Sequence, residues 1–255
     1  MIDTHAHLFA NEYDLDIHSV IKAFAQNDVK KVFLPNIDVS TIDALKQTCA
    51  INPNIFYPMM GLHPGSINQN FEQDLAIIYN ELLTNKYYAI GEIGIDLYWD
   101  KTFIEEQKKC FETQIKWAKA MQLPIAIHVR NAFDEVFEII DRNHDEKLSG
   151  VFHCFTGDIN QAKHVMEYRN FMFGIGGVVT YKTSTLPEVL KTVPLEFLVL
   201  ETDSPYLPPV PFRGKRNEPA YLTFIVKKLA EIYGISVTKI DEVTTANSNR
   251  LFKIG

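Results

Sequence analysis

Strand-like and helix-like segments alternate along almost the whole of this 255-residue chain. Eight short apolar runs rich in β-branched residues recur, among them "KKVFLPNI", "PIAIHV" and "EFLVLETD". Segments with the apolar spacing of helices lie between them, at 16–27, 41–50, 69–84, 103–121, 133–142, 158–169 and 186–192. Alternation of this kind predicts parallel strands joined by helical crossovers. Eight strands in about 250 residues suit a (β/α)8 TIM barrel, so we expect an α/β fold of that type.

The chain shows no internal point at which it would divide into domains. It has no linker, charge block, low-complexity tract or internal repeat. Two further helical segments, 219–233 and 236–249, follow the eighth strand and are expected to close the barrel. We therefore expect one domain over residues 1–255.

Composition narrows the classes of function. The chain is 46% hydrophobic with a formal net charge of −7, whereas proteins that coat long nucleic acid usually present a basic face. No stretch reaches membrane-spanning length, and "MIDTHAHLFA" lacks the basic start of a signal peptide. The three cysteines are scattered, which is typical of reduced thiols. We expect a cytoplasmic protein.

Histidines and carboxylates stand where the predicted strands end. They are His5, His7, Glu92, His128, His153 and Asp203. Side chains two apart on a strand share a face, so His5 and His7 would project into one small volume. Active sites of barrels lie at the carboxyl ends of the strands, where residues far apart in sequence converge. A lone histidine is usually a packing residue, but this repetition predicts a single functional site.

This set of side chains suits divalent metal ions. Imidazoles and carboxylates are ligands of zinc, manganese and magnesium, and six of them exceed the needs of one tetrahedral ion. Two ions that share Glu92 would fit, with His5, His7 and Asp203 on one and His128 and His153 on the other. Ions about 3.5–4 Å apart can hold a hydroxide and stabilise attacking and leaving oxygens. Glu92 and Asp203 would then take part directly in catalysis.

Four neighbouring residues have weaker claims to a role in the site. Glu201 shares the face of Asp203 and would bind a third ion or accept hydrogen bonds. Asp3 shares the face of His5, where a carboxylate can orient a ligand imidazole. His63, in "GLHPG", would touch a leaving group or phosphate, or serve the loop structure. Asp96 is expected to cap the loop after Glu92.

A basic loop, "FRGKRNEP", is the best candidate for phosphate binding. It places Arg213, Lys215 and Arg216 after the eighth strand, where barrels often bind phosphate. Arginine suits bidentate phosphate contacts, and a solvated loop is the alternative interpretation. Further candidates for substrate contact are Arg130, Lys182 and Tyr206, the last as a stacking surface or as turn packing.

The chain resembles the TatD-type metal-dependent hydrolases, a branch of the amidohydrolase-like barrels. The resemblance runs from end to end, through "IDTHAHL", "GEIGIDLYW", "FHCFTG", "LETDSPYLPP" and the closing "NSNRLF". It implies a metal-dependent deoxyribonuclease with 3′–5′ exonuclease activity and a ligand set of His5, His7, Glu92, His128, His153 and Asp203. Phe9 departs from the family, which usually has an acidic residue or asparagine there, so the shape of the substrate site is expected to differ.

Three functions follow in order of preference. The first is hydrolysis of DNA, as single strands or ends, with two divalent ions and without a membrane or an obligatory protein partner. The second is hydrolysis of another ester or amide, such as an aminoacyl-tRNA linkage. The third is a non-catalytic interaction protein that binds metal for stability.

Overall fold

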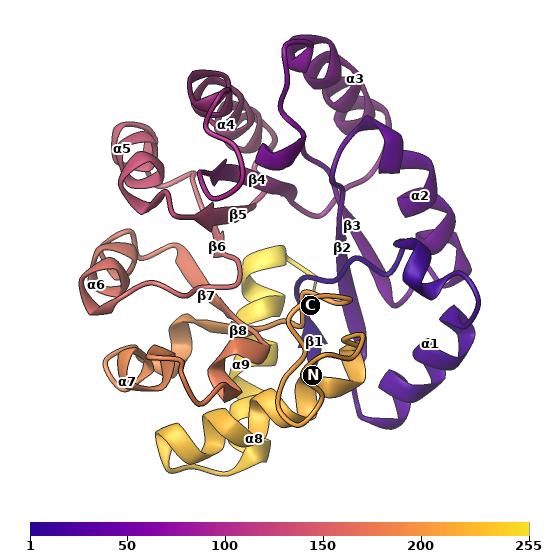
Figure 1. Cartoon of the computed structure of the whole chain (residues 1–255), viewed down its shortest axis with the longest axis vertical. Helices are drawn as coiled ribbons and strands as arrows, with labels where there is room; N and C mark the ends of the chain where they lie inside the picture. Colours follow the sequence, from indigo (N-terminus) through magenta and orange to yellow (C-terminus); the bar gives the residue numbers. More distant parts are fainter. Residues whose placement is uncertain (255) are drawn as a thin grey trace.

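Eight parallel strands form the centre of the molecule, and helices surround them (Figure 1). The computed structural model describes residues 1–254. Its strands are β1 (Ile2–Asp3), β2 (Lys31–Pro35), β3 (Phe56–Met59), β4 (Ile90–Asp96), β5 (Ile125–Arg130), β6 (Gly150–Phe152), β7 (Phe171–Ile175) and β8 (Leu198–Leu200). Their hydrogen bonds give two sheets, β1-β2-β3 and β4-β5-β6-β7-β8. The α/β barrel predicted from the alternation is confirmed.

A few backbone hydrogen bonds join the two sheets into a closed barrel on each side. On one side the Thr4 amide donates to the carbonyl of Leu200 at 2.9 Å, and Ala6 forms a parallel bridge with Ser204. On the other side the Gly91 amide donates to the carbonyl of Met60 at 3.2 Å. The first and last strands therefore lie side by side, although some 200 residues separate them.

The helices follow the predicted segments closely. They are α1 (Ile17–Gln26), α2 (Ile42–Ile51), α3 (Phe71–Thr84), α4 (Ile104–Met121), α5 (Phe133–Asn143), α6 (Ile159–Glu167), α7 (Leu186–Leu190), α8 (Leu222–Tyr233) and α9 (Val237–Phe252). Residues 219–221 form a 3-10 turn before α8, and α9 runs three residues beyond the predicted end. Within residues 1–254, no helix has the length and apolarity needed to cross a membrane.

An apolar plug fills the amino-terminal half of the barrel. Each strand, or the residue just before it, contributes one side chain, and the end of α9 completes the cluster: Ile2, Phe33, Met59, Ala89, Ala126, Val151, Met172, Val199, Leu251 and Phe252. The ring centroids of Phe33 and Phe252 are 4.1 Å apart. Alpha-helix α9 extends beyond its predicted end because its last turn buries Leu251 and Phe252 in this plug.

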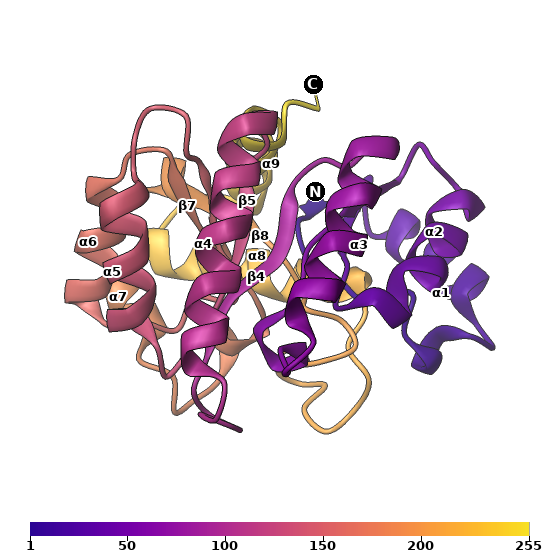
Figure 2. The same ribbon diagram turned by 90° about the horizontal axis from the view of Figure 1, so that it is seen from above.

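Polar side chains follow the plug along the same strands. Side chains two residues apart share a strand face, so Ala126 is followed inside the barrel by His128, Val151 by His153 and Val199 by Glu201. Seen from the side, the loops after β4 and β8 project at the end of the barrel opposite the C-terminus (Figure 2). The strand period thus changes the barrel interior from apolar to polar along its axis.

The plug predicts a sharp contrast between two leucine substitutions. Leu251→Ala should lower the free energy of unfolding by about 2–5 kcal/mol, because it leaves a cavity among buried side chains. Leu15→Ala removes the same atoms from a fully exposed position and should change stability by less than about 0.5 kcal/mol. Denaturant unfolding measures both. Equal losses would contradict the role of α9 in closing the barrel.

Candidate metal centre

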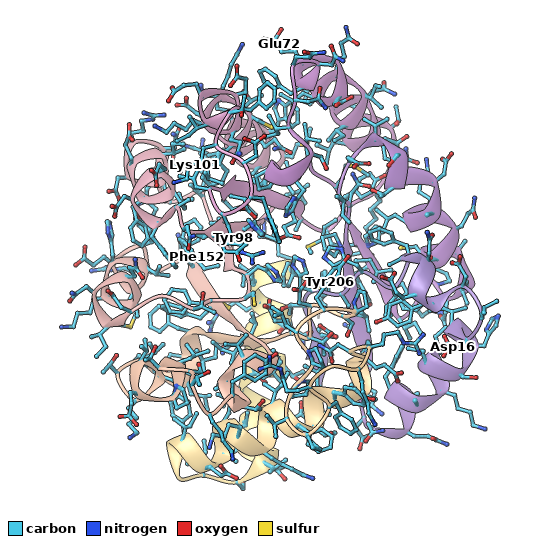
Figure 3. The ribbon with its side chains drawn as sticks, viewed as in Figure 1. Asp16, Glu72, Tyr98, Lys101, Phe152 and Tyr206 are labelled. Carbon is cyan, nitrogen blue, oxygen red and sulfur yellow. The ribbon has the colours of Figure 1, made fainter. Side chains whose placement is uncertain are left out.

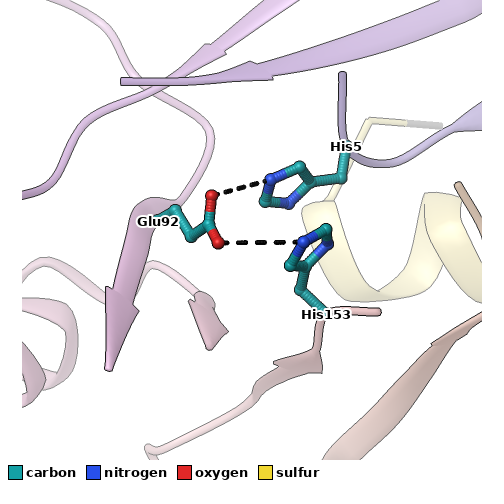
Figure 4. A group of neighbouring side chains, drawn as sticks. All are labelled: His5, Glu92 and His153. Carbon is teal, nitrogen blue, oxygen red and sulfur yellow. Dashed lines mark hydrogen bonds and ion pairs between the residues drawn. The ribbon is translucent and has the colours of Figure 1, made fainter. Parts of the chain in front are cut away.

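Glu92, near the start of β4, is the centre of the polar cluster. Its Oε2 lies 3.0 Å from His5 Nε2, and its Oε1 lies 2.7 Å from His128 Nδ1 and 3.7 Å from His153 Nε2 (Figure 4 shows His5 and His153). Glu92 is only 3% exposed. One buried carboxylate is therefore shared by histidines that come from three different strand ends.

A second carboxylate, that of Asp203, lies close to three histidines of the cluster. Asp203 Oδ1 lies 3.4 Å from His7 Nε2, 3.7 Å from His153 Nε2 and 4.0 Å from His5 Nε2. The rings of His5 and His153 stack with centroids 3.4 Å apart. All six residues predicted at the strand ends converge here, and two groups of them have the spacing of metal ligands: His5, His7 and Asp203, and His5, Glu92 and His153.

Glu201 stands behind His153. Its Oε1 accepts a hydrogen bond from the Cys154 amide at 2.5 Å and lies 3.0 Å from His153 Nδ1. A Cβ on Gly174 of the neighbouring strand would meet Glu201 Oε2 at 2.1 Å, so only glycine leaves room for this carboxylate. Glu201 is thus placed to orient the ring of His153, and together with Cys154 it could also hold an ion.

Asp3 fixes the backbone that carries His5. Its Oδ1 accepts hydrogen bonds from the amides of His5 and Thr202, and its Oδ2 accepts one from the Thr202 hydroxyl at 2.6 Å. Burial raises the pKa of Asp3 to about 7, against the effect of these hydrogen bonds. Asp3 acts on the backbone of His5 rather than on its ring, as the link between β1 and the residues after β8.

Asp96 has a role that the sequence analysis missed. Its Oδ1 caps the loop by accepting from the Tyr98 amide at 2.9 Å, as expected, but its Oδ2 lies 3.0 Å from His128 Nε2. His128 is held between Asp96 and Glu92 on the neighbouring strand. The signal was present, because Glu92, Gly94 and Asp96 alternate on β4 and so share a face.

The electrostatics of the cluster favour positive charge. Burial alone would raise the pKa of Glu92, but the facing histidines hold it well below its usual range. Burial alone would lower the pKa of His128, yet hydrogen bonds to Asp96 and Glu92 raise it to about 9. In the same way Glu201, Glu92 and Asp203 outweigh burial and raise the pKa of His153 to about 10. At pH 7 the rings of His128 and His153 therefore each keep a second proton beside the buried carboxylates.

The donors present fit divalent metal ions. Within residues 1–254, Glu92 and Asp203 form ion pairs only with histidines and with neither lysine nor arginine. A buried carboxylate is costly unless it is paired or coordinates a metal. Neutral imidazoles with carboxylates form the mixed nitrogen and oxygen set that binds transition metals.

His63 enters the cluster in a different way. Its Nδ1 accepts a hydrogen bond from the Gly65 amide at 2.9 Å, so the neutral ring carries its proton on Nε2. That atom lies 3.2 Å from His128 Nδ1 and 3.5 Å from Glu92 Oε1. Although its distances resemble those of a ligand, His63 presents a hydrogen-bond donor rather than a lone pair. Burial lowers its pKa, which keeps the ring neutral.

The cluster opens into a cavity of about 770 Å³. Arg130, Trp99 and Tyr206 are among the residues that line it, together with His63 and Asp203. Tyr98 and Tyr206, labelled in Figure 3, come from the loops after β4 and β8. Of the predicted substrate contacts, His63, Arg130 and Tyr206 therefore lie at this cavity.

The basic loop lies outside the lining of the cavity. Arg213 stacks on the ring of Tyr181, with Cζ 4.0 Å from its centroid, and Lys182 and Lys215 are exposed. The structure corrects the prediction that Arg216 binds phosphate. Both of its terminal nitrogens bind Asp16, at 2.8 and 2.7 Å, and one also binds Glu218 at 3.0 Å. A guanidinium paired in this way ties the loop to the start of α1 and has little left to offer a phosphate.

The sequence and the fold agree on one family. A profile of the family described as "TatD related DNase" matches residues 2–253. The chain belongs to this family. The metal-dependent hydrolase YabD of Bacillus subtilis, itself named uncharacterized, is 39% identical over 255 residues, which cover 100% of this chain and 99% of YabD.

Solved TatD structures have the same barrel. That of YJJV, a TatD homolog from Escherichia coli, matches with a TM-score of 0.93 and 29% identity, covering 100% of this chain and 98% of YJJV. The structure of a TatD family hydrolase from Entamoeba histolytica matches with a TM-score of 0.83 and 21% identity. The match covers 99% of this chain and 97% of that protein. The present chain is a metal-dependent hydrolase of the TatD family.

Phe9, the departure from the TatD pattern, lies beside the centre. Its buried ring packs edge-on against that of His7, with centroids 5.8 Å apart. Phe9 therefore supports a cluster residue by packing.

Metal binding to this TatD protein should release about two protons at pH 7. His128 and His153 hold protons there, because their pKa values are about 9 and about 10, and a histidine must be neutral to bind metal. Metal affinity should rise with pH, by up to about a hundredfold per unit below pH 9, since two protons are displaced. Calorimetric titration in buffers of different ionisation enthalpy counts them.

A matched control uses a histidine outside the cluster. His144 is exposed, and His144→Gln should leave the number of released protons unchanged. A metal affinity that is independent of pH would contradict ligation by His128 and His153.

Proposed function

We propose that this protein hydrolyses phosphodiester bonds in DNA, at single-stranded ends in the 3′–5′ direction. One observation carries the proposal: exposed aromatic rings, Trp99 and Tyr206, line the same cavity as the metal-binding cluster. Their exposed fractions are 77% and 50%. Aromatic rings beside a cationic group are the usual means of holding single strands, because every base has a face that can stack.

Arg130 favours a substrate that carries phosphate. It lines the cavity, and within residues 1–254 the contacts of its guanidinium are with the rings of Tyr98 and Trp99 rather than with a carboxylate. Arginine recognises phosphate through two parallel hydrogen bonds. The net charge of −7 opposes binding along a duplex, whereas a cavity with one local cation can bind a strand end.

The cluster would hold two divalent ions, with Glu92 shared between them. His5, His7 and Asp203 would bind one, and His128 and His153 the other. When bound, such ions supply Lewis acidity toward a phosphoryl oxygen and lower the pKa of water. Glu201 and Asp96 orient the rings of His153 and His128, respectively.

His63 is placed to act on the substrate itself. Its Nε2–H faces the cavity beside Glu92 while Nδ1 is held by the Gly65 amide. This fixed ring can donate a hydrogen bond to a non-bridging or leaving oxygen of the phosphodiester. Fixed hydrogen-bond donors of this kind stabilise negative charge that develops in a transition state.

A panel of substrates tests the proposal. Single-stranded DNA, duplex DNA, RNA and aminoacylated tRNA are incubated with protein that was stripped by chelator and reloaded with manganese, magnesium or zinc. We expect shortening of single-stranded DNA from its 3′ end and loss of activity on chelation. Deacylation of tRNA without cleavage of DNA would overturn the nuclease proposal.

Glu92→Gln should reduce DNA cleavage by about a hundredfold or more, because it removes the charge shared by the two proposed ions while keeping the side-chain volume. Thermal unfolding reports whether the fold survives, and metal analysis reports the ions retained. Glu105→Gln, the same change on the exposed surface of α4, should leave activity unaltered. Near-normal cleavage by Glu92→Gln would contradict a shared metal ligand.

A further inference from the structure

We propose that Arg130 binds the phosphate next to the one being cleaved, and that a second hollow beyond it receives the following nucleoside. The site is a two-part cleft for a short single strand, with a ridge of Arg130, Tyr98 and Trp99 between the parts. This inference rests on the proposed nuclease function and specifies the length of single strand that the protein binds.

The two hollows share part of their walls. A second cavity of about 610 Å³ adjoins the metal-binding cavity, and the two share Val129, Arg130 and Thr156 in their linings. Arg130 follows His128 by two residues on β5, a separation of about 6.6 Å along a strand. That length is comparable to one nucleotide step of an extended single strand, so Arg130 is spaced for the neighbouring phosphate.

Aromatic rings hold Arg130 without using its hydrogen bonds. Its Cζ lies 4.0 Å from the centroid of Tyr98 and 5.3 Å from that of Trp99. Stacking of a guanidinium on a ring leaves its N–H groups free at the edge, where a phosphate can accept two of them. Arg216 is the contrasting case, because Asp16 and Glu218 already occupy its guanidinium.

The two rings of the ridge serve different hollows. Trp99 lines the metal-binding cavity and Tyr98 lines the second one, and their planes meet at 90°. Both are more than half exposed. Each can therefore stack with a different base, on either side of the phosphate at Arg130.

The far hollow suits a nucleoside rather than another phosphate. Asp134 and Glu135 line it, and both stand in the first turn of α5. Their charge repels a phosphate but accepts hydrogen bonds from sugar hydroxyls and base amino groups. Thr156 and Gln161 add neutral polar groups to the same lining. The recognition unit therefore ends, beyond Arg130, in a nucleoside.

Steady-state kinetics on a dinucleotide with one phosphate and a trinucleotide with two test the proposal. For the parent protein, kcat/KM should rise by about tenfold to a hundredfold from the first to the second, as expected for one charge-assisted contact. Arg130→Ala should lose at least tenfold more on the trinucleotide than on the dinucleotide, mainly through KM. Arg130→Lys keeps the charge but not the planar guanidinium. Its gain in kcat/KM from dinucleotide to trinucleotide should lie between those of the parent and Arg130→Ala.

Arg213→Ala is the matched control. Arg213 also stacks on a tyrosine with Cζ 4.0 Å from the ring centroid, but lies outside both cavity linings. Its variant should keep the gain from dinucleotide to trinucleotide. Equal losses by Arg130→Ala on both substrates, or loss of the gain in Arg213→Ala as well, would overturn the assignment.

A terminal phosphate probes the far hollow. Adding one to the trinucleotide at the end that occupies this hollow should lower kcat/KM, and the double change Asp134→Asn and Glu135→Gln should remove that penalty. A terminal phosphate that improves the parent's kinetics would overturn the nucleoside site. If the parent protein cleaves no oligonucleotide with any metal, the proposed function itself fails, a result distinct from any of these.

Discussion

The negative charge buried at Glu92 is the constraint on which the carboxyl end of this barrel depends. Five histidines from four strand ends approach its two oxygens, and Asp203 adds a second buried charge beside them. A carboxylate in such surroundings needs positive charge nearby. The protein's own groups supply it only by protonating histidines, and bound metal ions would supply it more strongly.

The barrel accommodates this buried charge by keeping it at the opposite end of the strands from the apolar plug. Inward-facing positions two residues apart carry Ala126 and His128 on one strand, and Val151 and His153 on the next. The plug anchors the strands while their ends hold polar groups. The same residues that close the barrel also orient the site, since Asp3 binds both the His5 amide and Thr202.

Sequence was sufficient for the fold and for the set of residues that converge, because both follow from strand periodicity and from the common edge of parallel strands. It was insufficient where a contact depends on loop conformation or on barrel closure. Asp16 and Arg216 lie 200 residues apart, and no local pattern predicts their ion pair. The sequence shows that Asp96 shares a face of β4 with Glu92, but its distance from His128 depends on the register of β4 and β5, which shifts between Ile90 and Ile93.

The position of cationic groups resolves the apparent conflict between an acidic protein and the anionic substrate that we propose for it. Arg216 is neutralised by its partners, and Arg213 lies away from the cavity, so the basic loop contributes little local attraction. Arg130 stands at the cavity on aromatic rings, where it keeps its hydrogen-bond donors. Repulsion from the net charge acts along the length of a polymer, whereas one such arginine acts on a single phosphate. This balance is the reason why we propose the end of a strand as substrate, since an end exposes few phosphates to the acidic surface.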